Sequence, residues 1–302
     1  MSILDNLEVD DRLKASARKL KLFSYESIFY LTNPVGALSA KDVSALKQAA
    51  AKQLNVKRYT GGILCQGITE ISGESASGKT QFGLQLSLTA QLPTEYGGLD
   101  SGTLYICTED AFPSNRLYQM IKNFTSRHGN RICHHGNLGD KIFIEHVADF
   151  EGLTECLEKK ADLLLKSGTI KCIVLDSVAA HFRSDYEGHE MFKRAQHISM
   201  IGSLLFKYSQ QYNIPVICIN QVTSSMKSEG KQLIPSLGLT WSNHVTTRIM
   251  LSRTERVVTI HQDSVQCALE TVIRDMEIIY SPHLPSVTVP YIIDHEGMKG
   301  LK

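Results

Sequence analysis

The chain has 302 residues, of which 42% are hydrophobic and 21% are charged, and these proportions exclude a globally disordered chain. Its 32 Lys and Arg residues nearly balance 31 Asp and Glu residues, so a net charge of +1 excludes a polycation that binds nucleic acid through its overall field. The charge is unevenly spread: residues 1–60 and residues 111–139 each carry a net +4, which leaves −7 on the remainder.

The first 52 residues predict a small helical N-terminal domain. Leu13, Ala17 and Leu20 recur at helical spacing, and Ser39 followed by Asp42 is typical of a helix start. The polar residues 53–60 predict a short linker, and residues 61–302 predict the main domain. An N-terminal segment without an early basic cluster or apolar core is not expected to be a signal peptide.

From residue 63 onward, short apolar strands alternate with helical stretches, which is typical of an α/β fold with a mostly parallel twisted sheet. A β extension is expected to follow at the C-terminal end. We expect strands at 67–72, 103–107, 141–146, 170–175, 215–219, 246–252, 270–280 and 286–293, and helices at 80–92, 153–166 and 197–212.

The segment GESASGKT at residues 73–80 has the glycine-rich pattern of a phosphate-binding loop between a strand and a helix. Its glycines allow successive backbone N–H groups to turn toward phosphate oxygens, and the following helix adds the positive end of its dipole. Lys79 is expected to bind the β- and γ-phosphates and Thr80 to ligate Mg²⁺. The predicted nucleotide-binding residues of the loop are Gly73, Glu74, Ser75, Ala76, Ser77, Gly78, Lys79 and Thr80.

Three polar residues follow predicted buried strands, where a nucleotide site of this fold is expected. Asp176 is a candidate Mg²⁺ ligand, supported by Ser177. Glu109 is a candidate for orienting the attacking water, although Asp110 competes with it and either acid is consistent with a solvated strand end. Gln221 is placed to sense the γ-phosphate or simply to cap a turn.

The cysteines and the hydropathy of the sequence indicate the compartment of the protein and argue against a zinc site and a membrane span. The seven cysteines form no C-x-x-C pair, which favours a reducing intracellular compartment. Cys133, His134 and His135 have no second ligand pair, so we expect no structural zinc site. No apolar stretch approaches membrane-spanning length.

Several blocks of sequence together resemble the RecA-type recombinases and, among them, their eukaryotic paralogues. The blocks are YICTEDAFPSNRL, FIEHVAD, DSVAAHFRSDY, INQVT and SPHLP. The resemblance implies a RecA-like P-loop ATPase core preceded by a helix-hairpin-helix-like domain, with ATP and Mg²⁺ as cofactors. It also implies a catalytic role for Glu109 together with Lys79, an adenine-side role for Arg116 and a γ-phosphate-sensing role for Gln221.

The chain departs from the recombinase pattern at points that concern self-assembly. Residues 52–61 contain no Phe-x-x-Ala element, and Phe192 to Ala195 matches that string in a different part of the chain. Tyr280 stands where recombinases carry an acid that closes the neighbouring nucleotide. The segment GALSAKDV lacks a second glycine expected of a helix-hairpin-helix. These departures disfavour a long filament of this chain alone.

The resemblance implies two DNA-contacting loops, at about 183–196 and 223–236, with nearly balanced charge. Their candidate DNA-contacting cations are Arg183, Lys193, Arg194, Lys227 and Lys231. A single-strand groove usually combines positive charge with stacking aromatics, so one subunit is expected to bind DNA weakly. The opposing interpretation is that both loops form protein interfaces.

The predicted function is that of a DNA-dependent ATPase in homologous-recombination repair of double-strand breaks. The chain is expected to act in the nucleus, and also the cytoplasm, as a heterodimer with another recombinase paralogue. It would support the strand-exchange recombinase on single-stranded or branched DNA, with no membrane involved. The alternative is an interaction subunit held together by ATP that it does not hydrolyse, and a hexameric helicase is a third interpretation.

Overall fold

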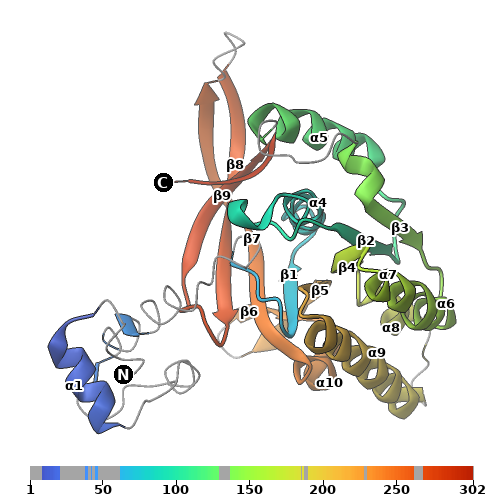
Figure 1. Ribbon diagram of the computed structural model, residues 1–302, viewed down its shortest axis with the longest axis horizontal. Coiled ribbons are helices and arrows are strands. Elements are labelled where there is room, and N and C mark those ends of the chain that lie inside the picture. The colour runs from blue at the N-terminus through green and yellow to red at the C-terminus, as the bar shows by residue number, and fades with distance from the viewer. Residues whose placement is uncertain are drawn as a thin grey trace.

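A computed structural model describes residues 9–20, 38–39, 42, 45–46, 62–128, 137–184, 186, 190–227, 230–261 and 268–301. In these parts of the chain ten strands form one sheet in the order β10-β9-β8-β7-β1-β5-β4-β2-β3, with β6 paired to β5 (Figure 1). The strands are β1 (Ile68–Gly73), β2 (Gly102–Cys107), β3 (Ile142–His146), β4 (Ile170–Asp176), β5 (Val216–Lys227), β6 (Gly230–Pro235), β7 (Val245–His261), β8 (Ala268–Tyr280), β9 (Thr288–Asp294) and β10 (Gly297–Gly300).

Strand pairing divides the sheet into a parallel and an antiparallel part. All pairings from β7 through β1, β5, β4 and β2 to β3 are parallel. Those from β7 through β8 and β9 to β10 are antiparallel. The expected α/β core with a C-terminal β extension is therefore confirmed.

Helices cover both faces of the parallel part (Figure 1). Those of the main domain are α4 (Lys79–Thr89), α5 (Ser114–His128), α6 (Phe150–Glu155), α7 (Asp162–Lys166), α8 (Ala180–Ser184), α9 (Met191–Tyr212) and α10 (Gly238–Ser242), with the 3-10 turns η3 (Thr94–Tyr96) and η5 (Leu138–Lys141) and the π-helical turn η6 (Cys156–Ala161). Helix α1 (Asp11–Lys19) belongs to the N-terminal unit. Leu104 and Ile106 of β2 belong to the core shared with α6–α9, whereas Tyr105 and Cys107 belong to the core shared with α4 and α5. This alternation along a fully buried strand explains its nearly continuous apolar sequence.

Helix α9 begins at Met191, six residues before the predicted start of this helix at 197. Its first fully buried apolar side chain is Ile198, and Phe192 is 84% exposed. The first turns therefore carry no apolar periodicity from which a helix could be predicted. Lys193 and Arg194 lie on this helix, so the prediction that they belong to a loop was wrong.

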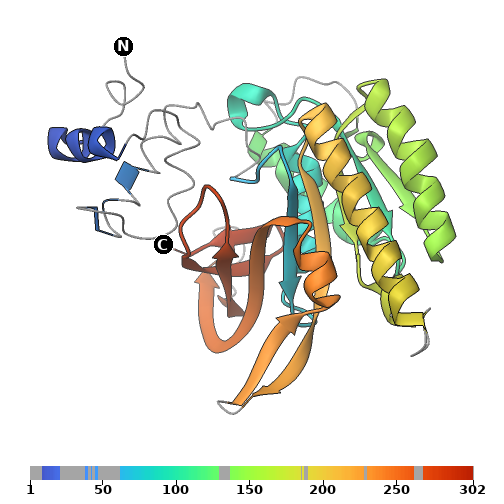
Figure 2. The same cartoon turned by 90° about the horizontal axis from the view of Figure 1, so that it is seen from below.

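The second predicted loop, 223–236, is mostly a β-hairpin. Strand β5 continues from the core through Lys227 and pairs with β6 from Val222↔Pro235 to Lys227↔Gly230. The residues of β5 beyond the core are mainly polar, so they lack the alternation that indicates a half-buried strand. Strand β7 is likewise longer than predicted and reaches His261. Figure 2 shows the β5–β6 hairpin projecting at the end of the molecule where α9 begins.

The described N-terminal residues agree with the predicted helical unit. The Asp10 carboxylate caps α1 by accepting a hydrogen bond from the Leu13 N–H at 2.7 Å. Ser39 and Asp42 bond reciprocally, with Ser39 N to Asp42 Oδ2 at 2.9 Å and Asp42 N to Ser39 Oγ at 3.2 Å. The remainder of this unit and the linker lie largely outside the described residues, so the domain boundaries stay a prediction.

A buried polar cluster crosses the sheet below its carboxyl edge. Glu70 in β1 is 0% exposed, and its carboxylate accepts hydrogen bonds from Asn220 Nδ2 at 2.6 Å and Trp241 Nε1 at 2.9 Å. It also pairs with the Arg248 guanidinium, which lies 5.2 Å from the centre of the Tyr280 ring. We call Glu70, Asn220, Trp241, Arg248 and Tyr280 the Glu70 cluster. The cluster connects β5, α10, β7 and β8 to β1, the strand that leads into the loop GESASGKT.

The described part of the chain shows two further features that bear on the predictions. It contains no helix that is both long and apolar enough to span a bilayer. It also contains no group of three or more His, Cys, Asp or Glu side chains arranged to hold a metal ion. Cys133, His134 and His135 lie outside it.

Candidate nucleotide-binding site

The loop GESASGKT connects β1 to α4 and has the backbone that its glycines predict. Gly78 has φ +103°, a conformation open to glycine at little cost. Gly73 has no room for a side chain, because a Cβ there would lie 2.2 Å from the Leu251 carbonyl oxygen of β7. Helix α4 begins directly after Gly78 with no acidic residue in its first turn, so the positive end of its dipole faces the loop.

Lys79 lies inside this loop rather than in solvent. Its Nζ donates hydrogen bonds to the carbonyl oxygens of Gly73 at 2.8 Å and Glu74 at 2.7 Å. Burial lowers the pKa of Lys79, while nearby Asp176, Glu109 and Glu74 oppose that shift. The ammonium group is therefore poorly solvated and already placed among phosphate-binding backbone groups.

Asp176, at the carboxyl end of β4, reaches the start of α4. Its Oδ2 accepts hydrogen bonds from Thr80 Oγ1 and from Tyr105 Oη, both at 2.8 Å. Burial raises the pKa of Asp176, and these two hydrogen bonds and Lys79 oppose the shift only in part. The two predicted Mg²⁺ ligands, Thr80 and Asp176, are thus brought together.

The prediction that Ser177 supports the Asp176 carboxylate was wrong. Ser177 N donates to Thr108 Oγ1 at 2.8 Å, and Thr108 Oγ1 donates to the Ser177 carbonyl oxygen at 2.6 Å. The Ser177 hydroxyl is buried and has no hydrogen-bond partner among the described residues. Tyr105 takes the supporting role instead, and it was not predicted because a tyrosine in an apolar strand looks like core.

Glu109 and Gln221 meet across the site. Gln221 Nε2 donates to both carboxylate oxygens of Glu109, at 2.6 and 2.8 Å. Glu109 follows β2 and Gln221 lies in β5, with β4 between these strands. Four adjacent parallel strands therefore deliver Gly73, Glu109, Asp176 and Gln221 to one edge of the sheet, where ligands bind in folds of this class.

These residues line a cavity of about 740 Å³ that is also bordered by Cys107, Pro113 and Ile293. Burial, followed by the nearby Asp176 charge, raises the pKa of Cys107 to about 12, so the thiol is neutral. The donor set fits a nucleoside triphosphate with Mg²⁺: backbone N–H groups and an ammonium for phosphate, and hydroxyl and carboxylate oxygens for the metal.

A family model described as Rad51 matches residues 46–300 of this chain. The chain belongs to the Rad51 family. It is 33% identical to the DNA repair protein XRCC3 of Mus musculus, with 99% of this chain and 98% of that protein covered. It is 32% identical to the XRCC3 homolog of Arabidopsis thaliana, with 79% and 88% covered, and 28% identical to RAD51 homolog 2 of Homo sapiens, with 79% and 64% covered. The resemblance to eukaryotic recombinase paralogues, and to XRCC3 among them, is confirmed.

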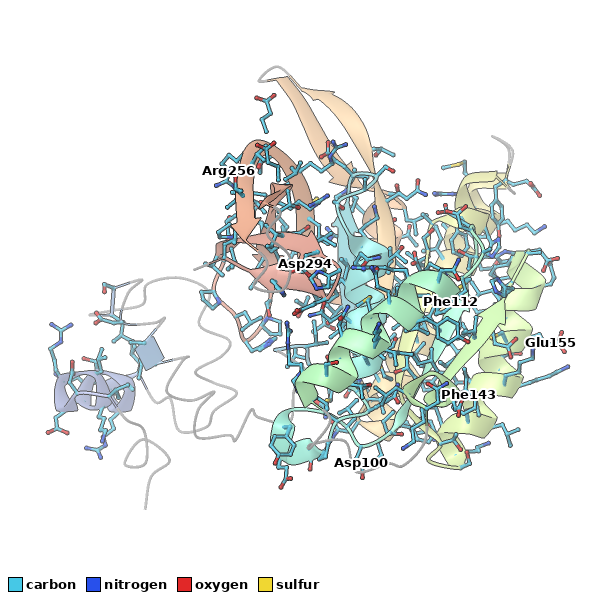
Figure 3. The ribbon with its side chains drawn as sticks, turned by 90° about the horizontal axis from the view of Figure 1, so that it is seen from above. Asp100, Phe112, Phe143, Glu155, Arg256 and Asp294 are labelled. Atoms are coloured by element: carbon cyan, nitrogen blue, oxygen red, sulfur yellow. The ribbon has the colours of Figure 1, made fainter. Side chains whose placement is uncertain are left out.

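In this Rad51-family chain Arg116, predicted to lie beside adenine, joins α5 to the C-terminal strands. Its guanidinium donates to Gln81 Oε1 at 2.6 Å and to the Asp294 carbonyl oxygen at 2.6 Å. Figure 3 shows Asp294 where the C-terminal strands meet the helical layer. Arg116 does not line the cavity, whereas its partner Gln81 does, so its adenine role stays a prediction.

The predicted DNA-contacting cations are spread over several elements of the Rad51-family core. Arg194 Nε donates to the Phe182 carbonyl oxygen at 2.6 Å, and Lys193 pairs with Glu190 at 3.6 Å. Arg183 lies in α8, Lys227 in β5 and Lys231 in β6, and their side chains are outside the described part. Their role in DNA contact stays a prediction.

Proposed function

We propose that this Rad51-family chain binds ATP with Mg²⁺ and acts in homologous-recombination repair of DNA double-strand breaks. The observation that carries nucleotide binding is the convergence of Lys79, Thr80 and Asp176 on one cavity at the start of α4. The repair role is supported by the relatives, since the mouse and bovine XRCC3 proteins are named DNA repair proteins.

Each residue of the site has a defined part in holding the nucleotide. The loop N–H groups and Lys79 bind the β- and γ-phosphates, and Thr80 and Asp176 hold the metal. When bound, Mg²⁺ neutralises phosphate charge. Pro113 and Ile293 offer an apolar wall within the same cavity.

Glu109 and Gln221 support weak, DNA-dependent ATP hydrolysis. A carboxylate beside the γ-phosphate orients a water for attack on phosphorus and accepts its proton, while the bond to the ADP oxygen breaks. The Gln221 amide holds Glu109 through both carboxylate oxygens. The same contact also suits the second candidate, a subunit that binds ATP structurally and does not hydrolyse it.

We further propose that the chain works in the nucleus, and also the cytoplasm, as a heterodimer with another recombinase paralogue that stabilises the strand-exchange filament. Two predicted DNA-contacting cations, Arg194 and Lys193, already bond to other residues of the same chain. The chain as a whole is nearly neutral. Contact with single-stranded or branched DNA is therefore expected mainly through the complex. A steep fall of single-strand affinity with salt would support direct phosphate contacts, and a flat response would contradict them.

Replacing Lys79 by alanine is expected to weaken ATP binding about 10- to 100-fold, because it removes a charge-assisted contact to phosphate. Binding of a fluorescent ATP analogue to the purified complex measures this loss. In cells that lack this protein, the variant is expected to fail to restore the repair of DNA double-strand breaks. Lys207→Ala on the exposed face of α9 is the matched control; equal ATP affinity in both variants would contradict the nucleotide site.

Replacing Asp176 by asparagine is expected to stabilise the ligand-free protein and to abolish most of its stabilisation by ATP and Mg²⁺. Both hydrogen bonds reach the single atom Oδ2, so an amide oxygen can accept them without a buried charge. The wild type at 100 times its Kd gains about 2.7 kcal/mol, a rise in Tm of about 4 °C for a chain of 302 residues. Thermal unfolding with and without ATP and Mg²⁺ measures both effects.

The ligand-free difference between wild type and Asp176→Asn depends on pH with a definite sign. A carboxyl group whose pKa is raised by folding binds its proton more tightly in the folded state, so protonation favours folding. As pH falls through the raised pKa, the wild type loses the cost of the buried charge and the two proteins converge in stability. Asp100→Asn, at an exposed site labelled in Figure 3, is the control; a gap that widened toward low pH would contradict the assignment.

A further inference from the structure

The C-terminal strands contact the phosphate-binding loop at two carbonyl groups, those of Ala76 and Ser77. Tyr291 in β9 is 3% exposed, and its hydroxyl donates a hydrogen bond to the Ser77 carbonyl oxygen at 2.5 Å. Arg274 lies directly opposite Tyr291 on β8, and its Nε donates to the Ala76 carbonyl oxygen at 3.3 Å. Two neighbouring side chains therefore hold two consecutive carbonyl groups of the loop.

The orientation of these carbonyl groups determines where the loop points its N–H groups. In a planar trans peptide the C=O and N–H bonds point in opposite directions. The Ser77 carbonyl and the Gly78 N–H belong to the same peptide group. Gly78 lines the cavity, whereas Ser77 and Tyr291 do not line it. A hydrogen bond that draws the Ser77 carbonyl toward Tyr291 thus turns the Gly78 N–H toward the space where phosphate binds.

The backbone around this peptide needs external support. Ala76 has φ +60° and Gly78 has φ +103°, so the loop leaves the ordinary backbone conformations on both sides of Ser77. The Ile293 side chain, two residues after Tyr291 on β9, fills the space beside the Gly78 Cα. Burial raises the pKa of Tyr291, so its hydroxyl remains a donor at neutral pH.

We propose that Tyr291 is a positioning residue for phosphate binding, holding the Ser77 carbonyl so that the Gly78 N–H faces the β-phosphate of a bound nucleotide. This inference rests on the proposed nucleotide site and adds to it a residue more than 200 positions further along the chain. Its effect is confined to ligands that carry phosphate groups, because the loop N–H groups bind phosphate oxygens and adenosine has none. Adenosine affinity is therefore unaffected.

Tyr291→Phe removes the hydroxyl and keeps the ring, so it tests the proposal directly. The full chain, purified with any subunit that accompanies it, is expected to bind ADP and ATP about 3- to 10-fold more weakly, with unchanged adenosine affinity in a competition assay. Tyr208→Phe is the matched control: Tyr208 is 4% exposed and donates to the Leu157 carbonyl oxygen at 2.9 Å, within the core shared with α6–α9. This control is expected to leave all three affinities unchanged.

Hydrogen exchange of the ligand-free protein provides a second measurement that needs no nucleotide. A peptide covering residues 73–80 is expected to exchange faster in Tyr291→Phe than in the wild type or in Tyr208→Phe. Equal exchange of this peptide and equal ADP affinity in the two variants would overturn the positioning role while leaving the nucleotide site intact. A wild type that binds neither ADP nor ATP would overturn the proposed function and the inference together.

Discussion

Replacing Glu109 by glutamine is expected to lower ATP hydrolysis by about 10²- to 10⁴-fold while ATP affinity stays close to that of the wild type. The amide is nearly the same size as the carboxylate and still accepts a hydrogen bond from Gln221, but it cannot take the proton of the attacking water. Phosphate release by the purified complex, with and without single-stranded DNA, measures hydrolysis. A fluorescent ATP analogue measures affinity in the same preparation.

Asp110→Asn provides the matched control, because Asp110 is the neighbouring acid and also lines the cavity. We expect this change to leave hydrolysis nearly intact. If Asp110→Asn lowered hydrolysis and Glu109→Gln did not, the roles of the two acids would have to be exchanged. If neither variant differed from a wild type that binds ATP without releasing phosphate, the non-hydrolysing alternative would be favoured.

Replacing Glu70 by alanine is expected to lower the free energy of unfolding by about 3–5 kcal/mol, because the change leaves the charge of Arg248, whose side chain is only 12% exposed, without its partner. The Asn220 amide loses one of its two acceptors and keeps the Ser236 carbonyl oxygen, and the indole N–H of Trp241 loses its acceptor in Glu70. Urea unfolding of the purified protein, followed by circular dichroism, measures the loss.

Asp275→Ala is the control for this experiment, since it breaks the ion pair between Arg256 and Asp275. The Arg256 side chain of this pair is 55% exposed. An exposed pair of this kind contributes at most about 1 kcal/mol. Equal losses in the two variants would mean that the Glu70 cluster is no more important than a surface ion pair. A double variant, Glu70→Gln with Arg248→Met, is expected to recover part of the loss by removing both charges.

The sequence predicted the parts of the site that depend on local pattern. Lys79 and Thr80 follow from the spacing of glycines between a strand and a helix, and Asp176 follows from its place after an apolar run. Local sequence does not show that the cavity reaches as deep as Tyr105. A tyrosine in an apolar strand was therefore indistinguishable from a residue of the hydrophobic core. Ser177 was misassigned because adjacency in sequence does not tell which way a hydroxyl points.

The fold was predictable where burial imposes a period and unpredictable where it does not. Strand β4, buried except at Lys171 and partly at Asp176, follows directly from its apolar sequence, and its observed bounds differ from the prediction at only one residue. The first turns of α9 and the β5–β6 hairpin extend away from the core, so they bury no continuous face. Their sequences therefore lack the apolar periodicity from which a helix or strand is predicted. Tyr291 could not be assigned to the site because its partner lies far away in the chain.

The hydrogen bond between Tyr291 and Ser77 spans 214 positions of the chain, and this separation has a consequence for biosynthesis. At about 5–20 residues per second, a ribosome needs roughly 10–40 s to synthesise the residues between the two partners. The phosphate-binding loop therefore leaves the ribosome long before the strand that braces it. An mRNA truncated before the codons of β9 would yield a chain that contains the whole loop and lacks the Tyr291 hydroxyl that holds it.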